Sequence, residues 1–204
     1  MATVHGPQTV PARTPRVAGP RRWRWTAKQF HKLSNMGFFG DRKVELINGD
    51  LYTLPTNPPH DTAVYLTSDT LRAAFGAGYY VRAQATLDLG RRYQPLPDVL
   101  VVGGGPRDYA AKHPTAGILL VEIADSSVRR DRTIKAHRYA HAGIADYWIV
   151  NLIDRQLEIY RNPQPDPARR GRFHYADVTI VPATGRAAPL ARPQAMIAVA
   201  DLLP

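Results

Sequence analysis

The stretches PDVLVV (residues 97–102) and ILLVEI (residues 118–123) decide the fold predicted for this chain. Both are short runs of aliphatic and β-branched residues, which are typical of buried strands rather than of strands with one face in water. Each run also holds one carboxylate, Asp98 in the first and Glu122 in the second. Burying a carboxylate is costly unless a cation or hydrogen-bond donors compensate it. We therefore expect the two carboxylates to share a partner, and Mg²⁺ is the simplest one because it binds through one or two carboxylates plus waters.

The length and charge of the chain indicate one domain with a basic arm in front of it. The chain has 204 residues, 44% of them hydrophobic, and a net charge of +10. Residues 1–22 are rich in Pro, Arg, Thr and Gly without a periodic apolar pattern, which predicts a disordered arm ahead of a single domain over residues 23–204. Five arginines and no acid precede Trp25, so half of the charge excess lies there. Such a balance favours polyanionic partners, although the arm can equally be an unstructured terminus without a role.

The composition also excludes several classes of site. There is no cysteine, which rules out disulfides, zinc–thiolate sites and cysteine nucleophiles and fits a cytoplasmic protein. No apolar run approaches the roughly 20 residues of a membrane span, and the N-terminus lacks the apolar block of a signal peptide. The three consecutive glycines after residue 102 are not followed by the Lys-Ser/Thr of a phosphate loop, which disfavours an ATPase.

Helical and strand patterns alternate along the chain. Asn48-Gly49 between two apolar runs is a strong hairpin signal, because both central residues of such a turn need positive φ. Residues 107–117 and 161–172 have no clear pattern and are expected to be irregular. The predicted elements are a helix over 27–36, a hairpin over 44–47 and 50–54, a helix over 60–75, strands over 79–89, 97–102 and 118–123, a helix over 130–142, a hairpin over 147–152 and 156–160, a strand over 178–181 and a short closing element over 197–203. This order predicts an α/β (α+β) fold with a mixed sheet flanked by helices.

Two further residues complete a candidate site. Lys135 lies on the helix after the Glu122 strand and shares a helix face with Asp131 and Tyr139, at i−4 and i+4. Its ammonium can orient a metal-bound water or offset developing negative charge in phosphodiester hydrolysis. Glu45, in the first hairpin, can add a third carboxylate.

Each of these residues also has a purely structural interpretation. Glu122 can form a structural salt bridge, Lys135 can pair with Asp131 on the surface, and Glu45 can be a solvated hairpin residue. His60 is expected at the start of a helix or at the rim of the site rather than as a metal ligand. His137 and His141 are four residues apart, but no acid completes a zinc set with them.

Six stretches in order resemble the Uma-two family of restriction-endonuclease-like proteins, a branch of the PD-(D/E)XK nuclease superfamily. The resemblance covers roughly residues 25–160, with a weaker echo near the C-terminus. The matching stretches are KVELINGDL (43–51), His60 at a helix start, PDV (97–99), VEIADSS (121–127), RDR through Lys135 to Tyr139 (130–139) and AGIADYWIV (142–150).

The resemblance implies a restriction-endonuclease-like domain and a metal-dependent endonuclease. Glu45, Asp98 and Glu122 match the family's acidic positions and would bind Mg²⁺ or Mn²⁺, and Lys135 matches its helix lysine. The wider superfamily places a lysine two residues after the second carboxylate, where this chain has Ala124. The expected substrate is nucleic acid, most directly DNA, and cleavage of both strands would need two sites and hence a homodimer. The competing interpretation is a binding or interaction module on the same fold that does not cleave.

Overall fold

A six-stranded sheet forms the centre of the protein. The structure, a computed structural model, describes residues 19–54 and 57–204, so residues 1–18 of the predicted arm lie outside the described residues. The strand order is β3-β4-β5-β6-β7-β8, in which β5 and β6 are parallel and all other neighbours are antiparallel. A β-α-β crossover joins the two parallel strands. The predicted mixed sheet flanked by helices is therefore confirmed.

The elements follow one another in the predicted order. Their bounds are α1 Ala27–Asn35, β1 Val44–Ile47, β2 Asp50–Thr53, α2 Pro58–Phe75, β3 Tyr79–Ala83, β4 Val99–Gly103, η1 Pro106–Tyr109, β5 Leu119–Ala124, α3 Val128–Arg130, η2 Asp131–Lys135, α4 Ala136–His141, β6 Asp146–Asn151, β7 Gln156–Pro165, β8 Phe173–Pro182, β9 Arg186–Ala187, β10 Ile197–Ala198 and η3 Val199–Leu202.

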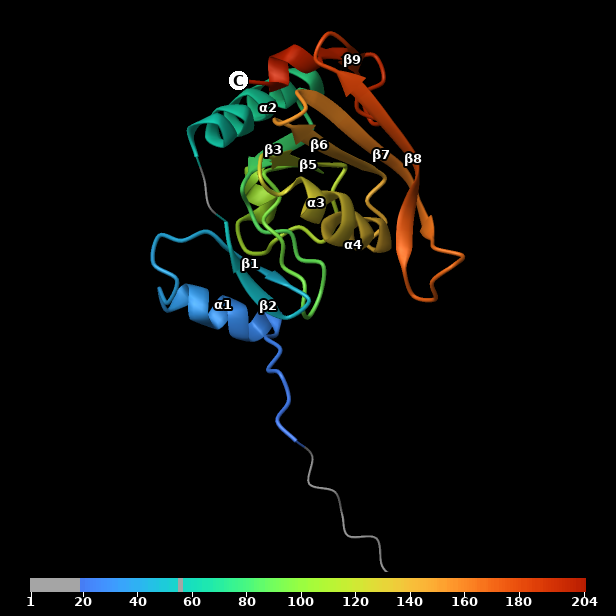
Figure 1. The fold of residues 1–204 in the computed structure, drawn as a ribbon. Helices are drawn as coiled ribbons and strands as arrows, with labels where there is room; N and C mark the ends of the chain where they lie inside the picture. The colour runs from blue at the N-terminus through green and yellow to red at the C-terminus, as the bar shows by residue number, and fades with distance from the viewer. Residues whose placement is uncertain (1–18, 55–56) are drawn as a thin grey trace, which may run out of the picture.

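The two faces of the sheet are covered by different parts of the chain (Figure 1). Helix α2 and the C-terminal segment pack on one face, where Phe75 and Leu202 are buried with Val121 of β5. Helix α4 packs on the other face, where Tyr139 is buried beside Leu120. Because neighbouring residues of a strand point to opposite faces, β5 contributes to both hydrophobic clusters and is buried along its whole length.

The β1–β2 hairpin and α1 form the lower end of the molecule in Figure 1. The predicted Asn-Gly turn is confirmed, with φ of 54° at Asn48 and 83° at Gly49. Thr26 caps α1 through a capping box with Gln29, which satisfies backbone groups that the first helical turn leaves free. The hairpin is joined to the rest of the protein by an isolated bridge between Leu46 and Gln94.

Several predicted boundaries were wrong. The late strand expected over residues 178–181 spans Phe173–Pro182. The strand expected over residues 79–89 ends at Ala83, because Gln84 has a φ of 45° and leaves the extended conformation. Helix α2 begins at Pro58 rather than His60, since prolines are tolerated in a first helical turn. The segment expected to be irregular over residues 161–172 instead extends β7 to Pro165.

The β7 extension is possible because it runs beyond the end of the neighbouring strand β6. Pairing between β6 and β7 ends at Asp146 and Arg161, whereas β7 continues to pair with β8 as far as Pro165 and Phe173. One side of this extension is therefore unpaired, and proline is accepted where no ladder hydrogen bond is needed.

Within the described part of the chain, no helix has the length and apolar character needed to cross a membrane.

Candidate active site

The register of two neighbouring strands brings the predicted carboxylates together. Asp98 immediately precedes β4, and Glu122 lies in β5. Val99 pairs with Val121, so Asp98 and Glu122 take the next opposite positions of the same antiparallel pair. Residues in such positions have Cβ atoms about 4.5–5.5 Å apart on one face of a sheet. The backbone N–H of Ile123 donates to Asp98 Oδ2 over 2.9 Å, which fixes the first carboxylate against β5.

Lys135 reaches the same face from the crossover helix. Its Nζ lies 2.8 Å from Glu122 Oε2, 3.6 Å from Asp131 Oδ1 and 3.9 Å from Glu45 Oε2. Only 5% of Lys135 is exposed, and Asp131 is 1% exposed. The interpretation of Lys135 and Asp131 as a solvated surface pair is therefore wrong, because both side chains are buried with two further carboxylates.

The helix that carries Lys135 is not a regular α-helix. It was predicted as one helix over residues 130–142, but it begins at Val128 and contains the π-helical turn η2 at Asp131–Lys135. The backbone N–H of Ala136 bonds to the carbonyl of Asp131, one residue farther back than in an α-helix. Such turns occur frequently at functional sites. Here the π turn begins and ends with the two ionisable residues that face the cluster.

Glu45 is buried in β1 with no exposed surface, so it is not a solvated hairpin residue. Arg130 pairs with its Oε1 atom, and the backbone N–H of Leu96 donates to Oε2 over 3.4 Å. The guanidinium of Arg130 also stacks 4.3 Å from the centre of the Tyr52 ring, on the adjacent strand. Glu45 therefore belongs to the cluster, where it contacts one arginine closely and approaches Lys135.

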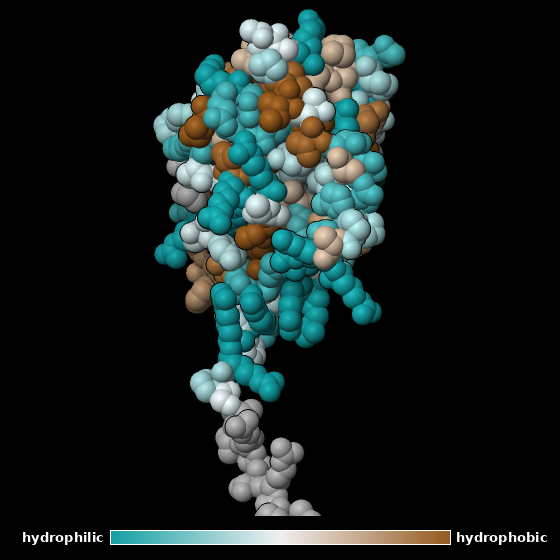
Figure 2. All heavy atoms as spheres, turned by 45° about the vertical axis from the view of Figure 1, so that its right-hand side comes forward, coloured by the Kyte–Doolittle hydropathy of each residue, from teal (hydrophilic) through white to brown (hydrophobic). Residues whose placement is uncertain are grey.

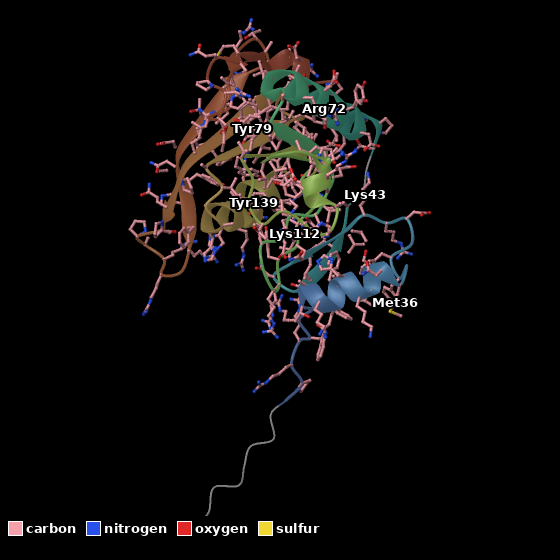
Figure 3. The ribbon with its side chains drawn as sticks, turned by 180° about the vertical axis from the view of Figure 1, so that it is seen from behind. Met36, Lys43, Arg72, Tyr79, Lys112 and Tyr139 are labelled. Carbon is pink, nitrogen blue, oxygen red and sulfur yellow. The ribbon has the colours of Figure 1, made fainter. Side chains whose placement is uncertain are left out.

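His60 and Tyr139 hold the two central carboxylates. His60, in the first turn of α2, lies with Nε2 3.3 Å from Asp98 Oδ2, and this hydrogen bond raises the pKa of His60. Tyr139 donates its hydroxyl to Glu122 Oε1 over 2.6 Å. Tyr139, labelled in Figure 3, therefore lies on the side of α4 that faces the sheet.

Burial and nearby charges set the protonation of the cluster. Burial raises the pKa of Glu122 to about 8, although Lys135 opposes this increase. Burial alone would lower the pKa of Lys135, but the surrounding carboxylates raise it well above its usual value, so the ammonium stays protonated. Burial would likewise raise the pKa of Asp98, yet the hydrogen bond and charge of His60 lower it overall.

The cluster opens into a cavity of about 890 Å³. Asp98, Glu122, Asp131 and Lys135 all line it, and the cations Arg129 and Arg130 lie at its wall. Asp131 Oδ1 is buried and has no hydrogen-bond partner among the described residues. In residues 19–54 and 57–204 no three His, Asp or Glu side chains are arranged to hold a metal ion together, so a metal here would rely on fewer protein ligands.

Comparison with known proteins identifies the family. Residues 27–191 match the Uma2 family, whose description is "Putative restriction endonuclease". The chain belongs to the Uma2 family. A crystal structure from Anabaena variabilis ATCC 29413, titled a putative nuclease belonging to DUF820, superposes with a TM-score of 0.63 at 14% identity. The match covers 87% of this chain and 96% of that one, so the two share a fold. A search of the curated proteins found no match.

The Uma2 resemblance predicted four site residues, and the structure brings Glu45, Asp98, Glu122 and Lys135 into one cluster. Their catalytic and metal-binding roles stay predictions. Sequence reasoning did not assign Arg130 or Gln84 to the site. Gln84 donates to Asp98 Oδ1 over 3.4 Å, and its only sequence signal was its position in an apparent strand. Arg130 lies in one of the matching stretches, but nothing in the sequence indicated its pairing with Glu45, which is 85 residues away.

Proposed function

We propose that this Uma2 protein is a metal-dependent endonuclease that hydrolyses phosphodiester bonds of nucleic acid, most directly DNA. One observation carries the proposal: a protonated, buried lysine lies among carboxylates at the floor of a large open cavity. A structural ion pair has no need of such a cavity, whereas phosphoryl transfer needs both charges at a substrate-accessible surface. The net charge of +10 and the arginines at the cavity wall favour a phosphate-bearing substrate.

The residues present fit Mg²⁺, with Mn²⁺ as an alternative. Asp98 and Glu122 occupy opposite positions at the cavity floor, and Mg²⁺ commonly uses only one or two carboxylates, with waters and substrate oxygens as its other ligands. Asp98 and Glu122 would hold the ion, and Glu45, which is not arranged with them as a third direct ligand, would assist from β1 beside Lys135. Bound there, the ion would polarise the phosphoryl oxygen and lower the pKa of a water. The raised pKa of Glu122 agrees with a site that needs more positive charge than Lys135 supplies.

The side chains of the protein have separate tasks in this proposal. Lys135, 2.8 Å from Glu122, orients the attacking water or offsets the negative charge that develops on the phosphoryl group. Tyr139 and His60 fix the orientations of Glu122 and Asp98. Arg130 forms an ion pair with Glu45, and this contact compensates the cost of burying the carboxylate.

The proposal includes a homodimer, because cleavage of both strands of a duplex needs two active sites. The second candidate is a nucleic-acid-binding or protein-interaction module without cleavage. The observation in its favour is Ala124, which leaves no lysine two residues after Glu122. The two candidates differ in one measurable respect, the appearance of cut strands.

Incubation of supercoiled plasmid and of single-stranded DNA with Mg²⁺, Mn²⁺ or EDTA tests the proposal. Cleavage is expected with either metal and not with EDTA. Asp98→Asn should abolish it, whereas the matched control Asp69→Asn, at an exposed position of α2, should cleave normally. Binding without cleavage in both metals would favour the non-catalytic module, and equal cleavage by Asp98→Asn would place the chemistry elsewhere.

A further inference from the structure

A second, smaller cavity lies outside the candidate active site. Its volume is about 280 Å³, and its lining residues are Asn48, Leu89, Arg92, Tyr93 and Arg138. None of them lines the larger cavity. The lining contains two guanidinium groups and no carboxylate, so the cavity is positively charged at every ordinary pH.

Arg138 is held in place at this cavity. One terminal nitrogen donates to Asn48 Oδ1, and the guanidinium carbon lies 5.5 Å from the centre of the Tyr93 ring. Its Nε atom is buried and has no hydrogen-bond partner in the described residues. Tyr93 is itself 95% buried, since its exposure is 5%, and its hydroxyl also lacks a partner there. Two buried donors at one small basic cavity therefore lack a partner within the part of the chain that the structure describes.

Contacts also fix the wall of the cavity that carries Arg92. The backbone N–H of Gly49 donates to the carbonyl of Arg92 over 3.0 Å, which ties the hairpin turn to the loop that carries Arg92. Asp50, the acid beside this turn, is already paired with Arg22 and Arg24. Across residues 19–54 and 57–204, neither Arg92 nor Arg138 forms an ion pair.

The surroundings are hydrophilic and adjoin the active site. Arg24 donates to the carbonyl of Asn48, so the N-terminal segment enters beside the cavity. Figure 2 shows hydrophilic side chains gathered at the end of the molecule from which this segment leaves. Arg138 follows Lys135 by three residues, which places the two cations one turn apart on neighbouring helical positions. A strand bound at the catalytic cavity can therefore continue toward the smaller one.

We propose that this cavity binds a phosphate group of the nucleic-acid strand on which the enzyme acts. Guanidinium groups match phosphate oxygens in geometry and stay charged, and two of them here have no competing carboxylate. The volume is below the roughly 300–1,000 Å³ of pockets for drug-sized ligands, so it suits one phosphate with part of a sugar. The proposal rests on the proposed function for the identity of the ligand, because free phosphate offers the same chemistry.

Calorimetric titration of the full-length protein with inorganic phosphate in chloride buffer tests the cavity directly. Phosphate should bind the wild type and should bind Arg92→Gln and Arg138→Gln at least tenfold more weakly. Arg72→Gln is the matched control, since Arg72 is exposed on α2, well away from the hairpin (Figure 3). Arg92 is also exposed, so its variant should fold normally and decides the outcome if Arg138→Gln unfolds. Equal phosphate affinity in Arg92→Gln and Arg72→Gln, or no binding by the wild type, overturns the proposal.

Nucleic-acid binding at several salt concentrations distinguishes the source of the phosphate. Arg92→Gln and Arg138→Gln should each reduce the slope of log K for DNA binding against log salt concentration by about 0.9, the value for one lost phosphate contact on duplex DNA. Weakened phosphate binding with an unchanged slope overturns the nucleic-acid assignment and indicates free phosphate as the ligand. Phosphate binding by a wild type that binds no nucleic acid supports the cavity while contradicting the proposed function.

Discussion

Replacement of Lys135 by methionine tests the charge balance on which the candidate site depends. The substitution keeps the length and volume of the side chain but removes the ammonium that lies 2.8 Å from Glu122, 3.6 Å from Asp131 and 3.9 Å from Glu45. At an effective dielectric constant of 20, one pair at about 3.6 Å has a gross attraction of about 4–5 kcal/mol, which the cost of burying the ammonium largely offsets. Removal of one partner from a buried pair costs about 3–5 kcal/mol, because the other charge is left uncompensated.

The expected loss of stability is therefore about 3–5 kcal/mol, which corresponds to a melting temperature roughly 6–20 °C lower in a chain of this length. Thermal and urea unfolding at neutral pH without metal measure it. Lys112→Met is the matched control, since Lys112 is exposed in a loop on the outside of the molecule (Figure 3), and it should change stability by less than about 0.5 kcal/mol. Equal stability of the two variants would refute the buried cluster and restore the surface-pair interpretation of Lys135.

The same position tests catalysis separately from folding. Lys135→Ala should lower single-turnover cleavage with Mg²⁺ by about 10²–10³-fold, the usual effect of losing one group that stabilises transition-state charge. Lys135→Arg should not restore the rate, because a planar fork cannot replace a compact ammonium in a site this crowded. Rates are compared at a temperature where each variant is folded. A wild-type rate in folded Lys135→Ala would remove this residue from the mechanism.

Three further predictions concern the metal, the acid stability and the arm. Mg²⁺ at about 100 times its dissociation constant should stabilise the wild type and Asp69→Asn by about 2.7 kcal/mol and leave Asp98→Asn unchanged; equal shifts in melting temperature for all three proteins would contradict a shared carboxylate site. Burial would raise the pKa of Glu158, but hydrogen bonds led by the one from Arg132 lower it to about 2. The stability that ionised Glu158 adds to the fold is therefore fully present above about pH 4.5 and is lost as pH falls through 2. At 1.36 kcal/mol per pKa unit, Glu158→Gln should thus lower the free energy of unfolding by up to about 3 kcal/mol at pH 7, measured by urea unfolding. If wild type and variant instead differ in stability by the same amount down to pH 2, ionisation of Glu158 is not the source of that difference. Deletion of residues 1–22, which hold four arginines, should flatten the salt dependence of DNA binding without changing the fold, and an unchanged slope would mean that the arm does not contact phosphates.

Local sequence patterns predicted the elements that depend on local physics. Asn48-Gly49 forms the expected turn because its positive φ values are intrinsic to those residue types. The two apolar runs became the buried strands β4 and β5, and the carboxylates within them met at the cavity floor. Trp148, in strand β6 of the predicted late hairpin, is completely buried.

Prediction was poorer where pairing with a distant segment decides the conformation. Residues 162–165 contain two prolines and were expected to be irregular, yet they extend β7 because β8 supplies a partner along one side. Likewise, nothing local marks the π turn at Asp131–Lys135, which forms within a helix that packs its inner face on the sheet.

The sequence by itself determined that carboxylates would be buried in strands and that they needed a cation. Only the tertiary structure decided which cations they receive: Lys135 between Glu122, Asp131 and Glu45, and Arg130 on Glu45 from 85 residues away. The residue type fixes the cost of burying a charge, because that cost comes from removing the water that surrounds the charged group. Compensation depends on distances of a few ångström between different elements, and those distances exist only once the sheet, the crossover helix and the hairpin have packed together.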